Sequence, residues 1–499
     1  MLAHWLFPFT TDSVIYVSTA ENISHFKGLV FSNFFVQPAI PDSLPTIFEP
    51  PGYPILIAAL KFFGINAYTA SLVWPRIGFL FLPFLFFIVF RKLMPSIVAW
   101  VASFVCTFMF PVVKCSLMAW TDVPYLCFSL ISLAMVFHII EKRTKVPIFF
   151  IFLTGIITGY AFLIRYVGLP LNLSIGIGLI GAFVIGLINF KDFLTTTAVY
   201  VLGVFLVVAP YVIRNLIVFG RIQPLSMRPS KISLQVSLHD YFRSLAEMVF
   251  TNRIFEGVVF ILMAGLIAGF VLFAWNTVKH EKTVFIYALI LLVYFVLDSV
   301  FLIGFKTIYL TPESIDERFL IQLAWIFMGG LVYAVHAVLK RLNAFVALDI
   351  KSITALILFA FVLVQVFPAV DFYYTQKTIK KVSEKIEQYA PLVQRLPKDC
   401  VIVSNVAEIT YYFAKRNVRM LGNYTPYGLL KVFGTKRRFV VFIIKEDEFL
   451  SPAWEYPRMW QNPQGYYKFF SDKNVDLFIP LPLGYILRGA GHVPVIIEP

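Results

Sequence analysis

The chain has 499 residues, of which 59% are hydrophobic and 14% are charged, and its mean hydropathy is +0.80. Because an ordinary soluble domain is roughly 25% charged, this composition excludes a soluble globular protein and indicates a polytopic membrane protein. The net charge of +14 does not indicate nucleic-acid binding, because most lysines and arginines stand in short loops between apolar runs, where they set topology and contact membrane surfaces.

The first acidic motif lies near the start of the chain. Asp12 stands in TTDSVIYVSTAENI, a pattern that predicts a helix with Thr10 or Thr11 as its cap. The preceding LAHWLFPF is too short to cross a membrane, and MLAHWLFPFTTD lacks the basic n-region of a signal peptide. We therefore expect residues 1–71 to form a first extracytoplasmic loop that carries Asp12.

A second acid, Glu49, opens the stretch FEPPGYPILIAAL. Pro50 and Pro51 force extended backbone before them, whereas Pro54 suits the first turn of a helix. The helix predicted over 54–63 is too short to span a membrane, so we expect it along the outer membrane surface. This arrangement holds Glu49 stiffly at the head of a lipid-facing helix, as suits a site for a lipid-linked substrate. A simple turn with a solvated Glu49 is the alternative.

Ten apolar runs predict a transmembrane helical domain over residues 72–369. They cover about 72–90, 97–113, 123–140, 148–164, 168–189, 194–213, 256–275, 284–304, 319–338 and 352–369. Alternate short loops carry clustered lysines and arginines, which predicts that these loops are cytoplasmic and the others extracytoplasmic. The long loop 214–255 is basic although it falls on the outer side, so its positive charge needs a reason other than topology.

The tail from 370 to 499 changes character. QKTIKKVSEKIEQYAPLVQRL has the pattern of an amphipathic helix, and CVIVSN, RRFVVFII and VDLFIPL are short runs typical of strands. We expect a small extracytoplasmic α/β domain. The predicted fold is therefore an α-helical polytopic membrane protein with this domain at its C-terminal end.

A third acid, Asp122, stands immediately before an apolar span in AWTDVPYLCFSLISLAMVF. A carboxylate at a membrane boundary is costly unless it is solvated or paired, so Asp122 is a functional candidate. The alternative is that Thr121 or Asp122 merely caps the helix that begins at Val123. Asp298, which lies deeper in its own span, is one of few other acids inside the membrane region.

Six motifs, taken together in this order, resemble those of GT-C glycosyltransferases. The similarity is greatest to the prokaryotic branch related to protein O-mannosyltransferases and to aminoarabinose transferases of lipid A, and it covers about residues 10–340. The motifs are TDSVIYVSTAENI, FEPPGYPILIAALKFFG, TDVPYLCFSLISLA, GYAFLIRYVGLPL, APYVIRNLIVFG and DERFLIQLAWIFMGGL. Each motif alone is weak, whereas the ordered set is specific.

The resemblance implies an enzyme that takes a sugar from a polyprenyl-phosphate carrier and transfers it, with inversion, to an acceptor on the outer face. Asp12 matches the catalytic acid of the first external loop, which would act as general base on the acceptor hydroxyl. Asp122 matches the second acidic position. Glu49 matches an acid that in some relatives is linked to a divalent metal, so the resemblance leaves a metal cofactor at Glu49 open.

Three arginines, Arg165, Arg214 and Arg318, fall on basic positions of the later motifs. A leaving phosphate at a membrane boundary needs positive charge aimed at its oxygens, and the guanidinium fork suits phosphate. This role would also explain cations on the outer side. The alternatives are that Arg165 or Arg214 reaches to lipid headgroups, and that Arg318 pairs with Asp316 or Glu317.

The sequence departs from the family pattern in two places. Relatives normally begin with a transmembrane helix before the catalytic loop, so either the true start lies upstream of Met1 or this form lacks that helix. Ser13 follows Asp12 where these branches usually carry a second acid, which weakens the case for a metal at Glu49.

The sequence thus predicts a multi-pass glycosyltransferase of the cell membrane with its active site at the extracytoplasmic face. Its expected partners are a polyprenyl-phosphate sugar, an acceptor that is a lipid, a glycan or a protein, and membrane lipids, with no nucleic acid. One rival function is a transporter or flippase for lipid or lipid-linked sugar, which would place ionisable residues deep in its spans. Another is a non-catalytic relative that only binds lipid-linked sugars.

Overall fold

The structure is a computed structural model, and it divides into two compact units, Ile47–Val370 and Met1–Thr46 with Asp371–Pro499. The residues that it describes are 9–32, 43–45, 49–142, 146–222, 230, 232–250, 257–263, 281–308, 315, 317–343, 350–396, 400–404, 410, 413, 418–420, 439–444, 466–471 and 475–480.

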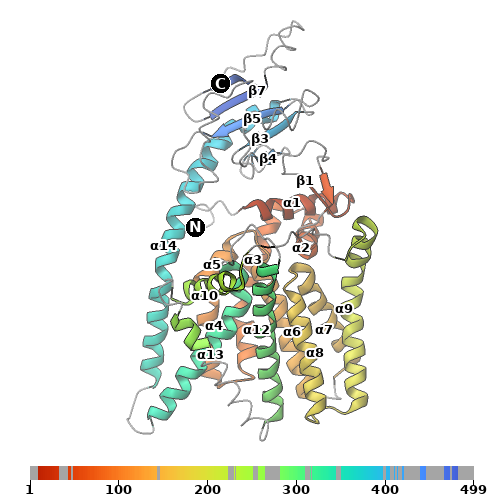
Figure 1. Ribbon diagram of the computed structural model, residues 1–499, viewed down its shortest axis with the longest axis vertical. Coiled ribbons are helices and arrows are strands. Elements are labelled where there is room, and N and C mark those ends of the chain that lie inside the picture. Colours follow the sequence, from red (N-terminus) through yellow and green to blue (C-terminus); the bar gives the residue numbers. More distant parts are fainter. Residues whose placement is uncertain are drawn as a thin grey trace. The chain divides into compact units, whose positions relative to one another are not determined.

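The larger unit is a bundle of helices, most of which run side by side along one direction (Figure 1). Its described helices are α2 (Gly52–Phe62), α3 (Ala67–Phe90), α4 (Ser96–Thr107), α5 (Phe110–Leu117), α6 (Asp122–Lys142), α7 (Ile148–Ile164), α8 (Gly168–Val184), α9 (Phe190–Phe219), α10 (Leu234–Phe250), α12 (Lys282–Ile308), α13 (Glu317–Asn343) and the first part of α14 (Ile350–Arg395). The apolar run at 256–275 lies largely outside the described residues, of which 257–263 are helical.

Several of these helices are long and apolar enough to cross a membrane. Five qualify singly within the described residues, namely α3, α6, α9, α12 and the Arg318–Leu339 part of α13. The pair α4 and α5 would make a sixth span, bent by 56°. The bend falls inside the single run predicted at 97–113, because Pro111 starts a new helical turn where its missing N–H is tolerated. The chain is a multi-pass membrane protein.

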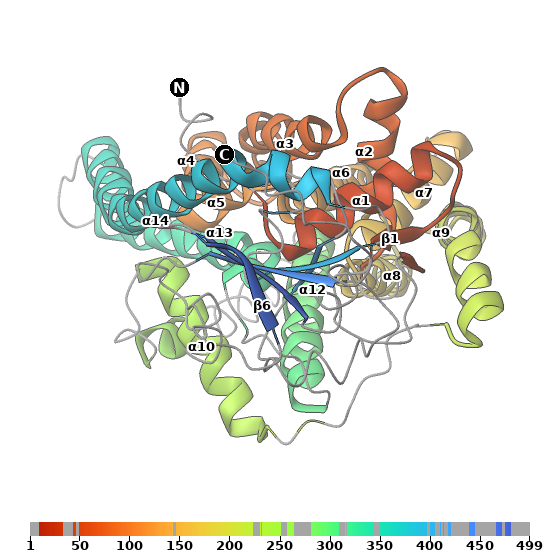
Figure 2. The same cartoon turned by 90° about the horizontal axis from the view of Figure 1, so that it is seen from above.

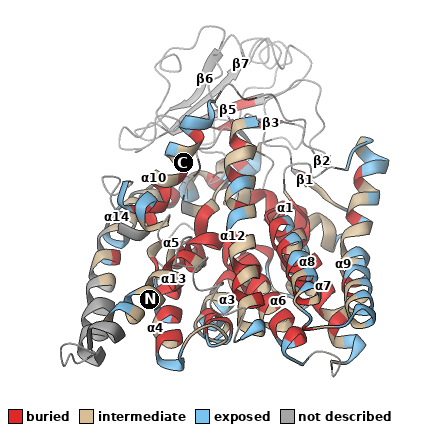
Figure 3. Cartoon of the chain, turned by 60° about the horizontal axis from the view of Figure 1, so that its bottom comes forward, coloured by how far each residue is buried: buried red, intermediate tan, exposed pale blue. Residues whose placement is uncertain are grey.

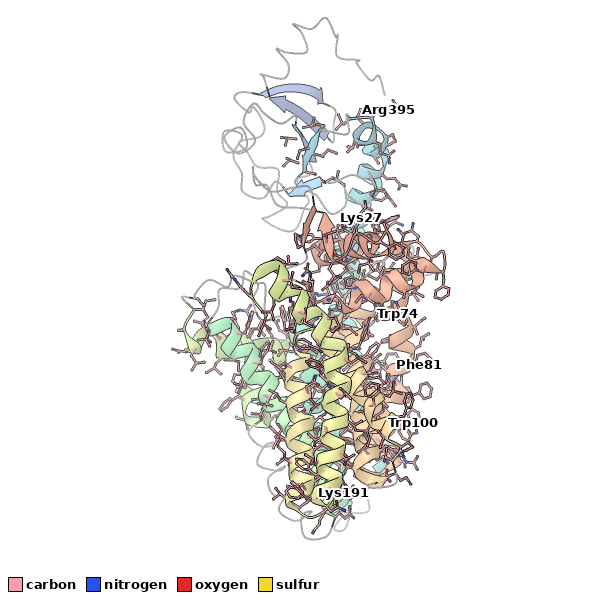
Figure 4. All side chains as sticks on the ribbon, turned by 90° about the vertical axis from the view of Figure 1, so that its right-hand side faces the viewer. Lys27, Trp74, Phe81, Trp100, Lys191 and Arg395 are labelled. Atoms are coloured by element: carbon pink, nitrogen blue, oxygen red, sulfur yellow. The ribbon has the colours of Figure 1, made fainter. Side chains whose placement is uncertain are left out.

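The outer surface of the bundle is apolar, as expected of helices that face lipid. Phe81 is 58% exposed and Phe205 is 63% exposed. Figure 4 places Phe81 and Trp100 along one side of the bundle, between Trp74 near one end and Lys191 at the other. The indole of Trp74 donates to the carbonyl of Leu56 over 2.9 Å, which ties α3 to α2.

The core of the bundle lies around α6. Of the five single spans, α6 has the largest buried share, 72% of its apolar window. It packs against α3, α5, α7, α8, α12 and α13, and the view from above shows it inside the bundle (Figure 2). In Figure 3 the buried residues gather on the inner faces of the helices, whereas α9 is mostly exposed or intermediate. The N-terminus of α6, where Asp122 stands, is therefore surrounded by protein.

Glycines allow α7 and α9 to approach closely. A Cβ added at Gly155 would lie 2.1 Å from the carbonyl oxygen of Tyr200, and one at Gly203 would lie 2.3 Å from that of Phe152. Small residues at such crossings are typical of membrane helix pairs. This contact fixes α9 against the bundle although most of its surface faces outward.

The smaller unit contains α1 (Thr11–Ser24), the antiparallel pair β1 (Val30–Ser32) and β2 (Ser43–Pro45), and a five-stranded sheet. The sheet has the order β4-β3-β5-β7-β6, with β4, β3 and β5 parallel and β7 and β6 antiparallel to their neighbours. Its strands are β3 (Val401–Ser404), β4 (Val418–Met420), β5 (Phe439–Ile444), β6 (Tyr466–Ser471) and β7 (Val475–Pro480). The three strands predicted from sequence are β3, β5 and β7. Helix α14 is continuous through the predicted boundary at residue 370.

Candidate active site

Asp122 is the first residue of α6 and its carboxylate is fully buried. The helix begins here because the carbonyl of Thr121 accepts the first helical hydrogen bond, from Tyr125 N over 2.9 Å. Pro124 in the first turn suits a helix start. The side chain of Asp122 forms an ion pair with Arg165, so it does more than cap its helix.

Arg165 reaches Asp122 from the end of α7. Its backbone is extended (φ −147°, ψ 138°), which ends the helix and leads into the tight turn before α8. Only glycine fits at position 168 of this turn, because a Cβ there would lie 2.6 Å from Phe162 Cα. The guanidinium Nη1 donates to Asp122 Oδ1 and, over 3.3 Å, to Thr121 Oγ1. With 12% of its side chain exposed, Arg165 points into the protein and not toward lipid headgroups.

Arg318 approaches the same carboxylate from the start of α13. Its Nε lies 3.8 Å from Asp122 Oδ2, and the side chain is 15% exposed. The guanidinium carbon lies 3.9 Å from the centre of the Trp120 ring, close enough for a cation–π contact. Of the alternative partners considered from sequence, Asp316 lies outside the described residues. Arg318 therefore has a described ion pair with Asp122.

Lys114, in the last turn of α5, borders this cluster. Its Nζ lies 5.9 Å from the Trp120 ring that Arg318 also contacts. The next residue, Cys115, is buried. No sequence motif contains Lys114, and the fold brings it next to Trp120.

The FEPPGYP stretch is docked at the end of α7, next to Arg165. The hydroxyl of Tyr160 donates to the carbonyl of Gly52 over 2.8 Å, and a Cβ at Gly52 would lie 2.5 Å from the backbone of Leu163. Tyr53 is buried and donates to the carbonyl of Ser71. Burial, and next the charge of Asp122, raise the pKa of the Tyr53 hydroxyl well above its ordinary value.

The other two predicted residues of this unit lie around the cluster. Glu49 immediately precedes the prolines and is partly exposed. Arg214, near the end of α9, donates from Nη1 to Asn215 Oδ1 over 2.9 Å, and its guanidinium carbon lies 5.0 Å from the Phe219 ring. Asp122, Arg165 and Arg318 are thus brought together, whereas the described contacts of Arg214 are with its own helix.

Asp12 belongs to the smaller unit and is described within it. It lies in the first turn of α1 and is partly exposed. The helix is capped by Thr10 and Ser13: Thr10 N donates to Ser13 Oγ over 3.1 Å, and the two hydroxyl oxygens are 3.2 Å apart. Ser13 is fully buried. The serine found in place of a second acid therefore closes the cap of the helix that carries Asp12.

No protein-family model and no curated protein matches the sequence. Solved structures do. ArnT from Cupriavidus metallidurans, bound to undecaprenyl phosphate, is similar with a TM-score of 0.53 and 13% identity, over 99% of this chain and 96% of that one. The oligosaccharyltransferase AglB from Archaeoglobus fulgidus, in complex with an inhibitory peptide and a dolichol-phosphate, is similar with a TM-score of 0.56 and 11% identity, over 88% of this chain and 66% of that one. The chain shares the fold of these membrane proteins.

A metal ion would need ligands that this chain can bring together. AglB has also been crystallised with Zn and sulfate, and that structure is similar with a TM-score of 0.54 and 14% identity. Within the described parts of the present chain, no three His, Cys, Asp or Glu side chains are grouped so as to hold a metal ion. Asp122 is engaged by two arginines. The residues described around Asp122 therefore do not fit a metal site, and a metal at Glu49 stays a prediction from the sequence.

Proposed function

We propose that the chain is an integral-membrane glycosyltransferase that moves a sugar from a polyprenyl-phosphate donor to an acceptor at the extracytoplasmic face of the membrane. The observation that carries this proposal is the buried cluster of Asp122, Arg165 and Arg318. The cluster fixes two guanidinium groups at one end of the bundle, and the guanidinium fork suits the oxygens of a phosphodiester. ArnT and AglB, which share the fold, were solved with undecaprenyl phosphate and with dolichol-phosphate.

The two arginines supply what a leaving phosphate requires. When the bond between the sugar carbon and the phosphate oxygen breaks, its electron pair remains on that oxygen as negative charge. Cationic groups fixed in a site shielded from water stabilise such charge more strongly than solvent does. Asp122 is buried between the two arginines, so we assign it the role of holding Arg165 and Arg318 in position and not that of a base.

Asp12 is the general base in this proposal. It takes the proton of the acceptor hydroxyl as the acceptor oxygen attacks the sugar carbon from the face opposite the phosphate, which inverts that carbon. Two observations support this assignment: Asp12 is partly exposed, and its helix is fixed by the Thr10–Ser13 cap. The acceptor is a lipid, a glycan or a protein.

We assign the outer end of the bundle from the distribution of charged residues among the loops. The topology rule puts the loops rich in lysine and arginine on the cytoplasmic side, so the opposite end of the bundle is the outer one. We therefore place the N-terminus of α6, helix α2 along the membrane surface, residues 1–71 and the domain from 370 onward on the extracytoplasmic side. Cysteine accessibility at positions in both sets of loops would test this placement.

Transfer by the full chain in lipid vesicles tests the proposal. Labelled polyprenyl-phosphate sugars are offered as a panel, and loss of label from the carrier is followed for the wild type, Asp12→Asn and, as a matched control in the same helix, Glu21→Gln. We expect one sugar to be released or transferred by the wild type and by Glu21→Gln, and release to fall at least a hundredfold in Asp12→Asn. Equal turnover in Asp12→Asn would remove Asp12 from the mechanism.

One observation favours the rival transport function. Asp298 in α12 is fully buried, and within the described residues neither of its carboxyl oxygens has a hydrogen-bond partner. Acids at such depth mark ion or substrate pathways in transporters. The vesicle assay separates the two functions: if every donor stays intact while labelled lipid crosses the bilayer, and Asp298→Asn stops the crossing, the transporter replaces the enzyme. A non-catalytic relative that only binds lipid-linked sugars would neither release the sugar from its carrier nor move lipid across the bilayer.

A further inference from the structure

Tyr125 lies one turn after Asp122 on α6, and its side chain reaches the turn that follows Arg165. The Tyr125 hydroxyl donates a hydrogen bond to the carbonyl oxygen of Val167 over 3.0 Å. The tyrosine side chain and Val167 are both buried, so solvent does not compete for this bond. The helix that binds the Arg165 guanidinium therefore also binds a backbone carbonyl two residues further on.

Residues 165–168 form a closed turn between α7 and α8. The amide of Gly168 donates to the carbonyl of Arg165 over 2.9 Å, and backbone atoms of α7 leave no room for a side chain at position 168. Val167 lies inside this turn. A hydrogen bond to the Val167 carbonyl therefore restrains the same piece of backbone from which the Arg165 side chain extends.

Helix α6 holds this turn at two points. Asp122 pairs with the guanidinium of Arg165, and Tyr125 binds the backbone at Val167. Residues three apart on an α-helix are neighbours on its surface, so both contacts come from one face of α6. The ion pair alone fixes only the end of a long side chain. The second contact fixes the backbone at its base, and the two together determine where the guanidinium lies.

Tyr294, from α12, fixes the hydroxyl of Tyr125 in turn. The two hydroxyl oxygens are 2.9 Å apart, and both side chains are buried. A tyrosine hydroxyl carries a single proton. Because Tyr125 donates its proton to Val167, the proton between the two hydroxyls belongs to Tyr294. Two hydrogen bonds in series thus run from α12 through α6 to the turn after Arg165, and buried bonds in series strengthen one another.

We propose that Tyr125 and Tyr294 are positioning residues for Arg165. The inference rests on the proposed function, in which Arg165 stabilises the negative charge on the leaving phosphate. Such stabilisation requires that the cationic group is already in place when the charge develops. Loss of the Tyr125 hydroxyl frees the turn and displaces the guanidinium, which lowers kcat more than it raises KM because the lost interaction belongs to the transition state.

Tyr287 offers a matched control in the same pair of helices. Its hydroxyl donates to the carbonyl of Phe137 over 2.9 Å, and its side chain is buried. It joins α12 to α6 by a bond of the same kind, about four turns further along α6 than Asp122. If these tyrosines only stabilise the bundle, Tyr125→Phe and Tyr287→Phe should therefore have the same effects.

The test compares the wild type, Tyr125→Phe, Tyr294→Phe and Tyr287→Phe as the full chain in nanodiscs. The dissociation constant of undecaprenyl phosphate, the thermal unfolding temperature, and kcat and KM for the polyprenyl-phosphate sugar that turns over are measured for each. Tyr125→Phe is also combined with Arg165→Lys, which keeps a charge at position 165 and removes the fork. Phenylalanine deletes only the hydroxyl oxygen and keeps the packing of the ring.

We expect kcat to fall about tenfold in Tyr125→Phe and about three- to tenfold in Tyr294→Phe, with KM changed less than about threefold. Undecaprenyl phosphate should bind about three- to tenfold more weakly to both variants. Tyr287→Phe should match the wild type in all three quantities, although its unfolding temperature falls as much as that of Tyr125→Phe. In the presence of Arg165→Lys, the change of Tyr125 to Phe should add little further loss.

Equal effects of Tyr125→Phe and Tyr287→Phe on binding and turnover would reduce the tyrosine pair to a structural role. Losses that multiply fully in the Arg165→Lys background would show that Tyr125 does not act through Arg165. If Tyr125→Phe fails to fold, Tyr294→Phe, which keeps the bond to Val167, carries the same comparison with Tyr287→Phe. If the wild type neither binds undecaprenyl phosphate nor turns over any donor, the proposed function fails and this inference fails with it.

Discussion

Arg165, at the end of α7, forms an ion pair with the fully buried carboxylate of Asp122 at the start of α6. The two residues are 43 positions apart in the chain and meet because α6 and α7 pack as antiparallel neighbours. Arg318 reaches the other carboxylate oxygen from α13. One carboxylate therefore joins three helix ends.

Replacing Asp122 should destabilise the protein strongly. Asp122→Ala leaves two largely buried guanidinium groups without their carboxylate, and removing one partner of a buried ion pair costs about 3–5 kcal/mol. We expect the unfolding temperature in detergent to fall by several degrees, followed by differential scanning fluorimetry. Glu141→Gln at the opposite end of α6 breaks only an exposed pair with Lys92 and should cost about 0–1 kcal/mol. Equal shifts in the two variants would contradict the central role of Asp122.

Arg318 and Trp120 should act as one unit. Trp120→Leu removes the ring on which the guanidinium lies, worth about 0.5–2 kcal/mol, while Trp120→Phe keeps an aromatic face. Because Arg318→Lys loses the planar fork, we expect transfer activity to fall about 10- to 100-fold in Arg318→Lys and in Trp120→Leu, and less in Trp120→Phe. A double mutant, Trp120→Leu with Arg318→Lys, should be little worse than either single variant, and additive losses would separate the two residues.

Larger side chains between α7 and α9 should separate these helices. Gly155→Leu and Gly203→Leu each place atoms against backbone carbonyls at 2.1 and 2.3 Å, and overpacking of this kind costs about 1–3 kcal/mol or more. Gly176, with nothing within 4 Å of its added Cβ, is the matched control in α8. We expect lower yields of folded protein by fluorescence-detected gel filtration for the first two variants alone. Normal yields for both would show that the close crossing is not required.

A single methyl group at Gly52 should disturb the active site. Its Cβ would meet the Leu163 backbone at 2.5 Å, which pushes α2 away from the end of α7 and so shifts Arg165. We expect Gly52→Ala to lower transfer activity about tenfold or more. Ala58→Gly in the same helix, at a buried position, controls for helix stability. Activity retained in Gly52→Ala would mean that docking of the FEPPGYP stretch does not position Arg165.

Substitutions at Asp12 and at Ser13 should affect different properties, turnover in the first case and stability in the second. Ser13→Ala removes a cap hydrogen bond and should cost about 0.5–2 kcal/mol of stability with smaller effects on the chemical step. Asp12→Asn should leave stability within about 1 kcal/mol and abolish turnover. Paired unfolding and turnover measurements on both variants check this separation. If Asp12→Asn mainly lowers stability, its function is structural.

Much of the fold follows from the sequence because apolar runs and basic loops are direct consequences of the bilayer. The apolar run at 97–113 shows a limit of such predictions. Hydropathy predicts one continuous segment, whereas the structure has two helices with a 56° bend between them, and Pro111 lies in the first turn of the second. The predicted domain boundary at residue 370 is a second example of this limit. Composition changes there, yet nothing ends helix α14, which continues to Arg395.

The candidate site was predictable where motifs carry its residues. Asp122, Arg165 and Arg318 each stand in a motif, and the structure brings them together. Lys114 could not be found, because its position beside Trp120 depends on the break between α4 and α5. The close approach of Gly52 to α7 could not be predicted from the sequence either, because it depends on the contact of two helices more than 100 residues apart.

The measurement that tests the central claim most directly is the affinity of the purified chain for undecaprenyl phosphate. The wild type, Arg165→Ala, Arg318→Ala and Lys191→Ala would be compared in nanodiscs at two salt concentrations, with Lys191 at the far end of α9 as control. The account predicts saturable binding that weakens about 10- to 100-fold in each arginine variant and stays unchanged in Lys191→Ala. Binding that is indifferent to Arg165 and Arg318 would contradict a phosphate site at Asp122 and, with it, the proposed reaction.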